Sequence, residues 1–124
     1  MDDLAEWYGA QLDEDERTAR ACSGDGKWTA DDIAIYGQDL GVEVRAHMAV
    51  HDPARVLREI EAKRELLDEH QDVNDGYCGT CVDGQWGYPT HGGSSAQRFP
   101  CRTLRLLATV YRDRPGYRAE EWAP

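Results

Sequence analysis

Apolar side chains recur at helical spacing through the first twenty residues. They are Leu4, Tyr8, Leu12 and Ala19. This period is typical of an amphipathic helix that buries one stripe. The acidic run at residues 13–16 points mainly away from the stripe, and the turn-rich residues 23–26 end the pattern. We therefore expect an acidic N-terminal helix over residues 1–22.

The period changes to alternation in the next part of the chain. Two short β-prone runs, residues 33–36 and 42–45, flank the glycine-bounded loop 37–41. Such runs around a five-residue loop are typical of a hairpin. We expect a β-hairpin over residues 27–46, with its apolar face packed on the helices because a lone hairpin is marginal in water.

The clearest helix follows in the middle of the chain. Asp52 is a favourable N-cap, and Pro53 suits the first helical position, where no amide donor is needed. The inward positions are Val56, Leu57, Ile60 and Leu67. This pattern predicts a central helix over residues 52–70.

Residues 71–101 lack a sustained apolar period and are rich in glycine and polar side chains. A structureless loop of this length inside a compact domain needs something else to order it, and a bound metal would do so. Helical spacing then returns, and it predicts a C-terminal helix and tail over residues 102–124. Tyr117 and Trp122 are expected to dock the tail.

The pair Cys78-Gly79-Thr80-Cys81 is the strongest chemical signal in the chain. A C-x-x-C pair supplies two thiolates from one tight turn, as in many tetrahedral zinc sites. Cys101 lies at the start of the last predicted helix, where the helix dipole favours a thiolate. These three cysteines predict a zinc knuckle over residues 71–101.

The fourth ligand is open between two histidines. His70 is the first choice, because it follows Leu67 by three residues and so lies on the inner face of the central helix. His91 is the alternative, in the glycine-rich stretch after the knuckle. Cys22 is interpreted as a small buried hydrophobe, and the pair His47 and His51 as packing and capping residues.

A closed four-ligand site is structural, whereas three ligands and a water would make a catalytic zinc. Three cysteines activate water poorly, and the H-x-E and P-C-x-x-C motifs of zinc deaminases are absent. The sequence therefore favours structural Zn²⁺. The alternative is a small zinc-dependent enzyme or nucleic-acid-processing factor, with an open site at the three cysteines and His91 or Glu69 as acid–base group.

The formal net charge of −10 disfavours charge-driven binding to nucleic acids or anionic membranes. The acidic start lacks an apolar leader, and no stretch approaches the length of a membrane span. These features predict a cytoplasmic protein with a protein partner. Six arginines between residues 98 and 118 either contact an acidic partner or offset the acidic part of the same chain.

Three segments carry a family resemblance: His51–Arg64, Pro100–Ala108 and Tyr117–Trp122. With the N-terminal helix and the C-x-x-C pair, the chain resembles a family of small proteins of actinobacteria and their phages, a domain of unknown function. In that family the long helix ends in a histidine, followed by a C-x-x-C and a later Pro-Cys. The resemblance therefore implies His70 as fourth ligand and supplies no activity.

Together these patterns predict one small α+β domain with three helices, a β-hairpin and a zinc-knuckle segment. The predicted metal ligands are His70, Cys78, Cys81 and Cys101, with His91 as the alternative fourth ligand. The predicted function is that of a non-enzymatic, zinc-stabilised interaction module, with the small zinc enzyme as the alternative.

Overall fold

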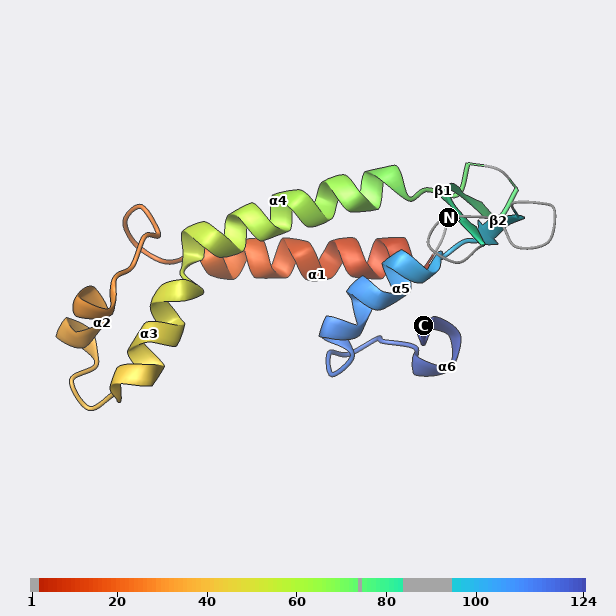
Figure 1. Cartoon of the computed structure of the whole chain (residues 1–124). Helices are drawn as coiled ribbons and strands as arrows, with labels where there is room; N and C mark the ends of the chain where they lie inside the picture. The colour runs from red at the N-terminus through yellow and green to blue at the C-terminus, as the bar shows by residue number, and fades with distance from the viewer. Residues whose placement is uncertain (1–2, 74, 84–94) are drawn as a thin grey trace. The chain divides into compact units, whose positions relative to one another are not determined.

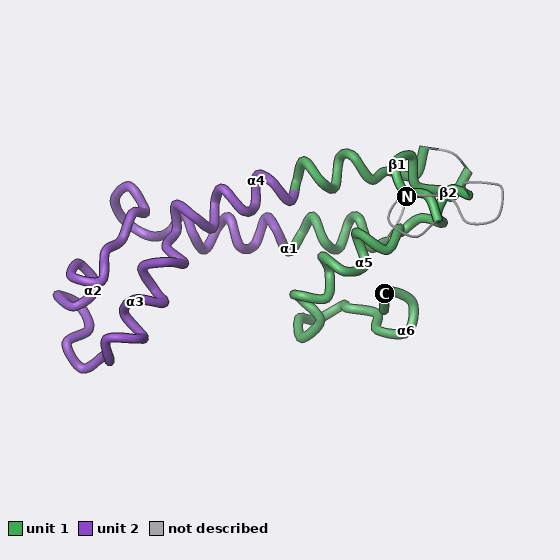
Figure 2. The backbone as a smooth tube through the Cα atoms, viewed as in Figure 1, with its two compact units in different colours: residues 1–11, 64–124 green, residues 12–63 purple. Residues whose placement is uncertain are grey.

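The computed structural model describes residues 3–73, 75–83 and 95–124. These residues fall into two compact units, unit 1 (residues 1–11 and 64–124) and unit 2 (residues 12–63), which Figure 2 distinguishes by colour. None of the helices in the described ranges is both long and apolar enough to cross a membrane.

The described part of the chain forms six α-helices, one 3-10 helix and two strands (Figure 1). In chain order they are α1 (Asp3–Arg20), α2 (Ala30–Tyr36), α3 (Val42–Val50), α4 (Pro53–Glu69), β1 (Tyr77–Asp83), β2 (Ser95–Arg98), α5 (Arg102–Ala108), η1 (Thr109–Tyr111) and α6 (Ala119–Trp122). The predicted mixture of helices with a small antiparallel sheet is confirmed, but the number of helices is six rather than three.

Helix α1 confirms the first predicted helix and its buried stripe. The four apolar positions expected to face inward are all buried: Leu4, Tyr8, Leu12 and Ala19. The first two belong to unit 1 and the last two to unit 2, so α1 contributes core residues to both units. A single sequence stripe therefore serves two small cores.

The C-terminal tail docks on the start of α1 within unit 1. The ring of Trp7 lies 5.6 Å from that of Tyr117 and 5.5 Å from that of Trp122, centroid to centroid. Its indole nitrogen donates a hydrogen bond to the carbonyl of Pro115 at 2.9 Å. The predicted docking of the tail by Tyr117 and Trp122 is confirmed.

The hairpin predicted over residues 27–46 is wrong, because these residues form α2 and the first half of α3. Thr29 begins α2 with a capping box: its side chain accepts from the amide of Asp32, and the Asp32 side chain accepts from the amide of Thr29. This reciprocal cap satisfies two amides that a helix start would leave unpaired. The five-residue loop that resembled a hairpin turn joins two short helices instead.

Helix α4 confirms the predicted central helix, and its N-cap works as expected. Asp52 Oδ1 accepts a hydrogen bond from the amide of Arg55 at 2.9 Å, and its Oδ2 accepts one from the amide of Trp28 at 3.1 Å. One carboxylate therefore caps α4 and also holds the segment that leads into α2. These two amides, that of Arg55 first, hold the pKa of Asp52 below its ordinary value.

Replacing Asp52 by Ala should lower the thermal unfolding midpoint, because two amides lose their acceptor. The folded-state pKa lies below the ordinary 3.8, so the carboxylate stabilises the fold above about pH 3.8 and loses this contribution as the pH falls through the folded-state pKa. The difference in midpoint between parent and variant is therefore expected to be full at neutral pH and to shrink below pH 4. Asp68→Ala, at an exposed position late in the same helix, is the control. A difference that is constant with pH would contradict this role.

Gly116 should tolerate no side chain, because a Cβ there would lie 2.7 Å from Trp7 Nε1. Gly76 has the same positive φ of 91° but open space around it. Both Ala variants incur the left-handed penalty of about 1–2 kcal/mol, and Gly116→Ala should also displace the docked tail. We expect a larger drop in unfolding midpoint for Gly116→Ala, with altered tryptophan fluorescence. Equal drops would show that the contact with Trp7 is unimportant.

Candidate metal centre

His70 directly follows the last residue of α4 and is 7% exposed. Its amide still donates to the carbonyl of Leu66 at 3.2 Å, which continues the helical turn. The ring is therefore held by the end of a 17-residue helix rather than by a loose loop. This explains why helical spacing from Leu67 placed the ring correctly.

The two cysteines of the C-x-x-C pair lie in an irregular part of β1. Tyr77 pairs with Arg98 and Val82 with Ala96, so five steps along β1 (77 to 82) match two along β2 (98 to 96). In a regular strand, residues three apart point to opposite faces. The extra residues of the bulge let Cys78 and Cys81 turn their sulfurs to the same side.

Cys101 is the N-cap residue of α5 and is fully buried. It lies beside the buried Leu104 and Ala108 of the same segment, which belong to the core of unit 1. The third sulfur therefore comes from a buried part of the unit.

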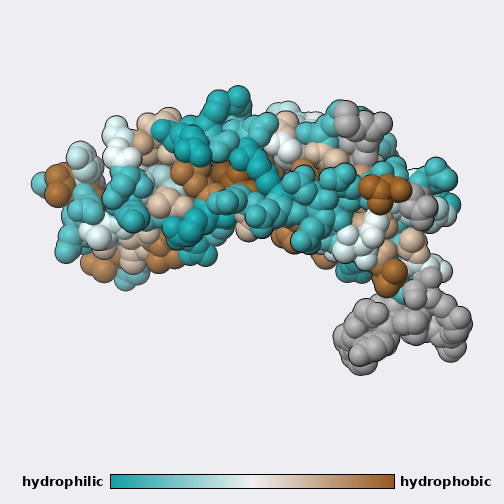
Figure 3. All heavy atoms as spheres, turned by 90° about the horizontal axis from the view of Figure 1, so that it is seen from above, coloured by the Kyte–Doolittle hydropathy of each residue, from teal (hydrophilic) through white to brown (hydrophobic). Residues whose placement is uncertain are grey.

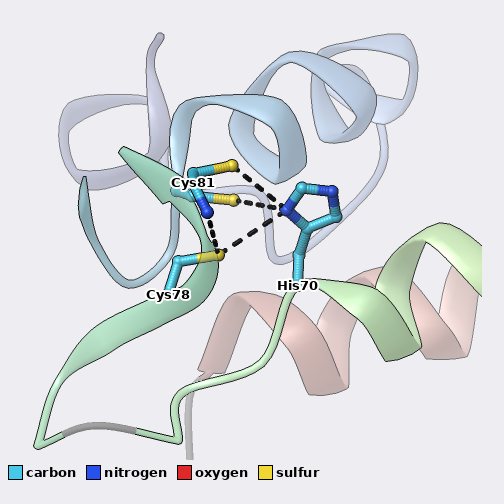
Figure 4. Close-up of side chains that lie close together, drawn as sticks. His70, Cys78 and Cys81 are labelled. Atoms are coloured by element: carbon cyan, nitrogen blue, oxygen red, sulfur yellow. Dashed lines mark hydrogen bonds between the residues drawn. The ribbon is translucent and has the colours of Figure 1, made fainter. Parts of the chain in front are cut away.

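The structure brings the four side chains into one cluster, whose ligand atoms all lie within 4.8 Å of one another. His70 Nδ1 lies 3.6 Å from the Sγ of Cys78, 3.2 Å from that of Cys81 and 3.5 Å from that of Cys101. Figure 4 shows the three sulfurs converging on this one ring nitrogen. The four residues could hold a metal ion.

Hydrogen bonding alone does not satisfy this arrangement. A ring nitrogen carries either one hydrogen or one lone pair, so it can serve one of the three sulfurs. A tetrahedral zinc, with Zn–S near 2.3 Å and Zn–N near 2.05 Å, would separate sulfur and nitrogen by about 3.6 Å. The observed 3.2–3.6 Å is close to that value, so a central ion accounts for all three contacts at once.

Two backbone amides face the sulfur of Cys78. The amides of Thr80 and Cys81 each donate to Cys78 Sγ at 3.5 Å. Burial raises the pKa of Cys78, but these two amides and the neighbouring thiols of Cys101 and Cys81 outweigh burial and hold the pKa below its ordinary value. The knuckle backbone is therefore arranged to favour a thiolate at this position.

Cys101 lies in the opposite electrostatic setting. Burial, together with the nearby Cys78, raises the pKa of Cys101 to about 12. A cation among the sulfurs reverses this preference, because a thiol that coordinates a metal loses its proton. A set of three thiolates in so small a volume would therefore need a positive charge at its centre.

Hydroxyl groups complete the surroundings of the cluster. Thr103 Oγ1, in the first turn of α5, lies 3.7 Å from the sulfur of Cys81. The hydroxyl of Thr80 donates to the backbone carbonyl of Glu69, and so ties the knuckle to the end of α4. Neither contact was predicted from the sequence. A Thr two residues after a candidate ligand at a helix start was the available signal for Thr103.

The other candidates lie apart from the cluster. Cys22 is in unit 2, is partly exposed, and directs its sulfur to the carbonyl of Thr18 at 3.8 Å. The rings of His47 and His51 lie 4.5 Å apart, also in unit 2, and join no group of three potential ligands among the described residues. His91 lies outside the described residues.

The chain matches the model of the family of unknown function DUF6221 over residues 1–124, and it therefore belongs to that family. The resemblance to a family of unknown function is thereby confirmed. No curated protein and no solved structure gives a significant match to the chain.

Replacing Thr103 by Val should weaken the binding of added metal at the cluster by roughly tenfold, because the hydroxyl beside the sulfur of Cys81 is lost while the side-chain shape is kept. A competition titration with a chromophoric chelator measures the change. Thr109→Val is the matched control, since its hydroxyl donates to the carbonyl of Leu106, outside the cluster. Equal zinc affinity in both variants would mean that the contact of Thr103 with Cys81 is incidental.

Proposed function

We propose that this member of the DUF6221 family is a non-enzymatic interaction module whose unit 1 is stabilised by one Zn²⁺. The ligands are His70 Nδ1 and the sulfurs of Cys78, Cys81 and Cys101. The observation that carries the proposal is the convergence of three sulfurs on one ring nitrogen at 3.2–3.6 Å. No pattern of hydrogen bonds satisfies that geometry, and a tetrahedral ion does.

The chemistry of the donors supports zinc over other metals. Three thiolates and one imidazole are soft to borderline ligands, which Mg²⁺ and Ca²⁺ avoid. A tetrahedral set of sulfur and nitrogen is typical of zinc, and Cys₃His is one of its usual structural combinations.

The number of protein ligands supports a structural rather than a catalytic ion. Catalytic zinc keeps one position for water, whereas four protein ligands fill a tetrahedron. The alternative enzyme needs His70 to leave the metal and a general base to approach it. Glu69 has an exposed side chain, and within the described ranges no carboxylate joins the cluster.

The polar composition of the knuckle supports the proposal that a metal stabilises its fold. Among the described residues of the segment 71–100, Cys78 alone is buried. Such a segment gains little from apolar burial, so it lacks the usual compensation for ordering its backbone. Structural zinc contributes about 10–16 kcal/mol of apparent binding free energy in small modules, which would offset a substantial part of the cost of ordering the backbone around the ligands.

The cellular role proposed here is binding of a protein partner in the cytoplasm. The net charge of −10 opposes charge-driven binding of nucleic acid or anionic lipid.

Protein purified without added metal should contain one zinc per chain by elemental analysis. His70→Ala, Cys78→Ser and Cys101→Ser should each lower the zinc content and the unfolding midpoint, because each removes one of four ligands. Cys22→Ser and His47→Ala, which change the same residue types outside the cluster, should keep both. Chelation should increase hydrogen exchange at the amides of residues 70–73, 75–83 and 95–111.

Two results would count against the proposal. Substoichiometric zinc in the parent protein would contradict the proposal that one Zn²⁺ binds at the cluster. Full zinc content and an unchanged midpoint in His70→Ala would remove His70 from the ligand set and favour an open site.

A further inference from the structure

Helix α3 is apolar but buries none of its residues. Its sequence, VEVRAHMAV, contains three valines, all exposed: Val42 (67%), Val44 (48%) and Val50 (54%). On the neighbouring α2, Ile35 is 72% and Tyr36 is 93% exposed, while Ile33 alone is buried. An apolar helix of this kind is normally covered on at least one side.

A groove of about 560 Å³ adjoins these helices within unit 2. Its apolar lining is Trp28, Ile33, Ile35, Tyr36 and Met48. Figure 3 shows hydrophobic side chains at the surface at the left end, where Figure 1 places α2 and α3. The groove and the exposed side chains Ile35, Tyr36, Val42 and Val44 are called the α2–α3 face below.

Acidic side chains border this face. Residues 23–51 contain five acidic residues and two basic ones. The acidic residues are Asp25, Asp31, Asp32, Asp39 and Glu43, all exposed. Two of them, Asp25 and Asp32, line the groove itself together with one basic residue, Lys27, so acidic groups remain in excess. The α2–α3 face is therefore an apolar centre with a negatively charged rim.

The negative charge of the rim distinguishes between three possible occupants of the α2–α3 face. An anionic lipid surface would be repelled by the rim. A second copy of the chain, paired about a two-fold axis, would set one acidic rim against another. A partner with apolar anchors flanked by lysine or arginine meets both the apolar centre and the rim.

We propose that the α2–α3 face is the docking surface of the module and that it binds a basic amphipathic helix of another protein. Apolar anchors of that helix lie in the groove beside Trp28 and Met48, and its basic residues face Asp31, Asp39 and Glu43. This inference rests on the proposed interaction function but involves none of the metal ligands.

The test uses two fluorescent amphipathic peptides of about five helical turns, with the same leucine face. One carries lysine on its polar face and the other carries glutamate. Fluorescence anisotropy with the zinc-loaded chain should show the lysine peptide binding roughly tenfold or more tightly, and more weakly as salt is added. Zinc content is measured for every variant, so that loss of peptide binding is distinguished from loss of the metal.

Three variants locate the binding. Ile35→Ser with Tyr36→Ser should abolish it, and these exposed positions leave the fold intact. Asp39→Lys with Glu43→Lys should reverse the preference toward the glutamate peptide. Val110→Ser, an equally exposed apolar side chain in unit 1, is the control and should bind as the parent does.

Equal binding of the two peptides, no binding of either, or full binding by the Ile35–Tyr36 variant would each overturn the proposal. Sedimentation of the parent chain adds one further outcome. A dimer that the same variant dissociates would make a second copy the occupant of the face in place of a basic partner. In each case a stoichiometric zinc content would still support the proposed metal site, so the two proposals are tested separately.

Discussion

The convergence of three sulfurs on His70 Nδ1 is the constraint on which unit 1 depends. The four side chains come from the end of α4, from β1 and from the start of α5. Apolar burial holds α5 through Leu104 and Ala108, but it contributes little to the segment between α4 and α5, whose described part buries Cys78 alone. A central cation would supply the missing attraction, and would also resolve the conflict between a thiolate favoured at Cys78 and a neutral thiol favoured at Cys101.

The bulge in β1 follows from the same constraint. A regular strand would send the two cysteines of a C-x-x-C pair to opposite faces. Instead the register between β1 and β2 slips by three residues around Cys78–Cys81, and amides of the bulge point at Cys78 Sγ. The ladder between β1 and β2 loses regular residue pairs at the same place where the sulfur of Cys78 gains two amide donors. The irregular part of β1 thus coincides with the residues that turn two cysteine sulfurs toward His70.

The sequence predicted what depends on local period and on ligand spacing. The stripe of α1, the cap and course of α4, the docking tail and the grouping of His70 with three cysteines all came from such patterns. The hairpin over residues 27–46 failed because Ile33–Tyr36 and Val42–Arg45 have β-branched side chains in short runs, where strand and helix periods are hardly distinguishable. The decisive signal was the Thr29–Asp32 capping box, which belongs to a helix start. The true strands were missed because β1 and β2 carry no apolar alternation.

Some of the arginines near the C-terminus interact with other residues of the same chain. Three arginines in the C-terminal part of unit 1 find partners within that unit. Arg118 pairs with Asp3 and Glu121, Arg114 donates to Gln11 and lies over Tyr111, and Arg105 donates to the carbonyls of Pro100 and Ala123. By contrast Asp31, Asp39 and Glu43 of unit 2 form no ion pair with any described residue. The exposed carboxylates of α2, α3 and the loop between them are therefore available to another molecule. These carboxylates, more than the net charge of the whole chain, are the groups that the proposed basic partner would meet.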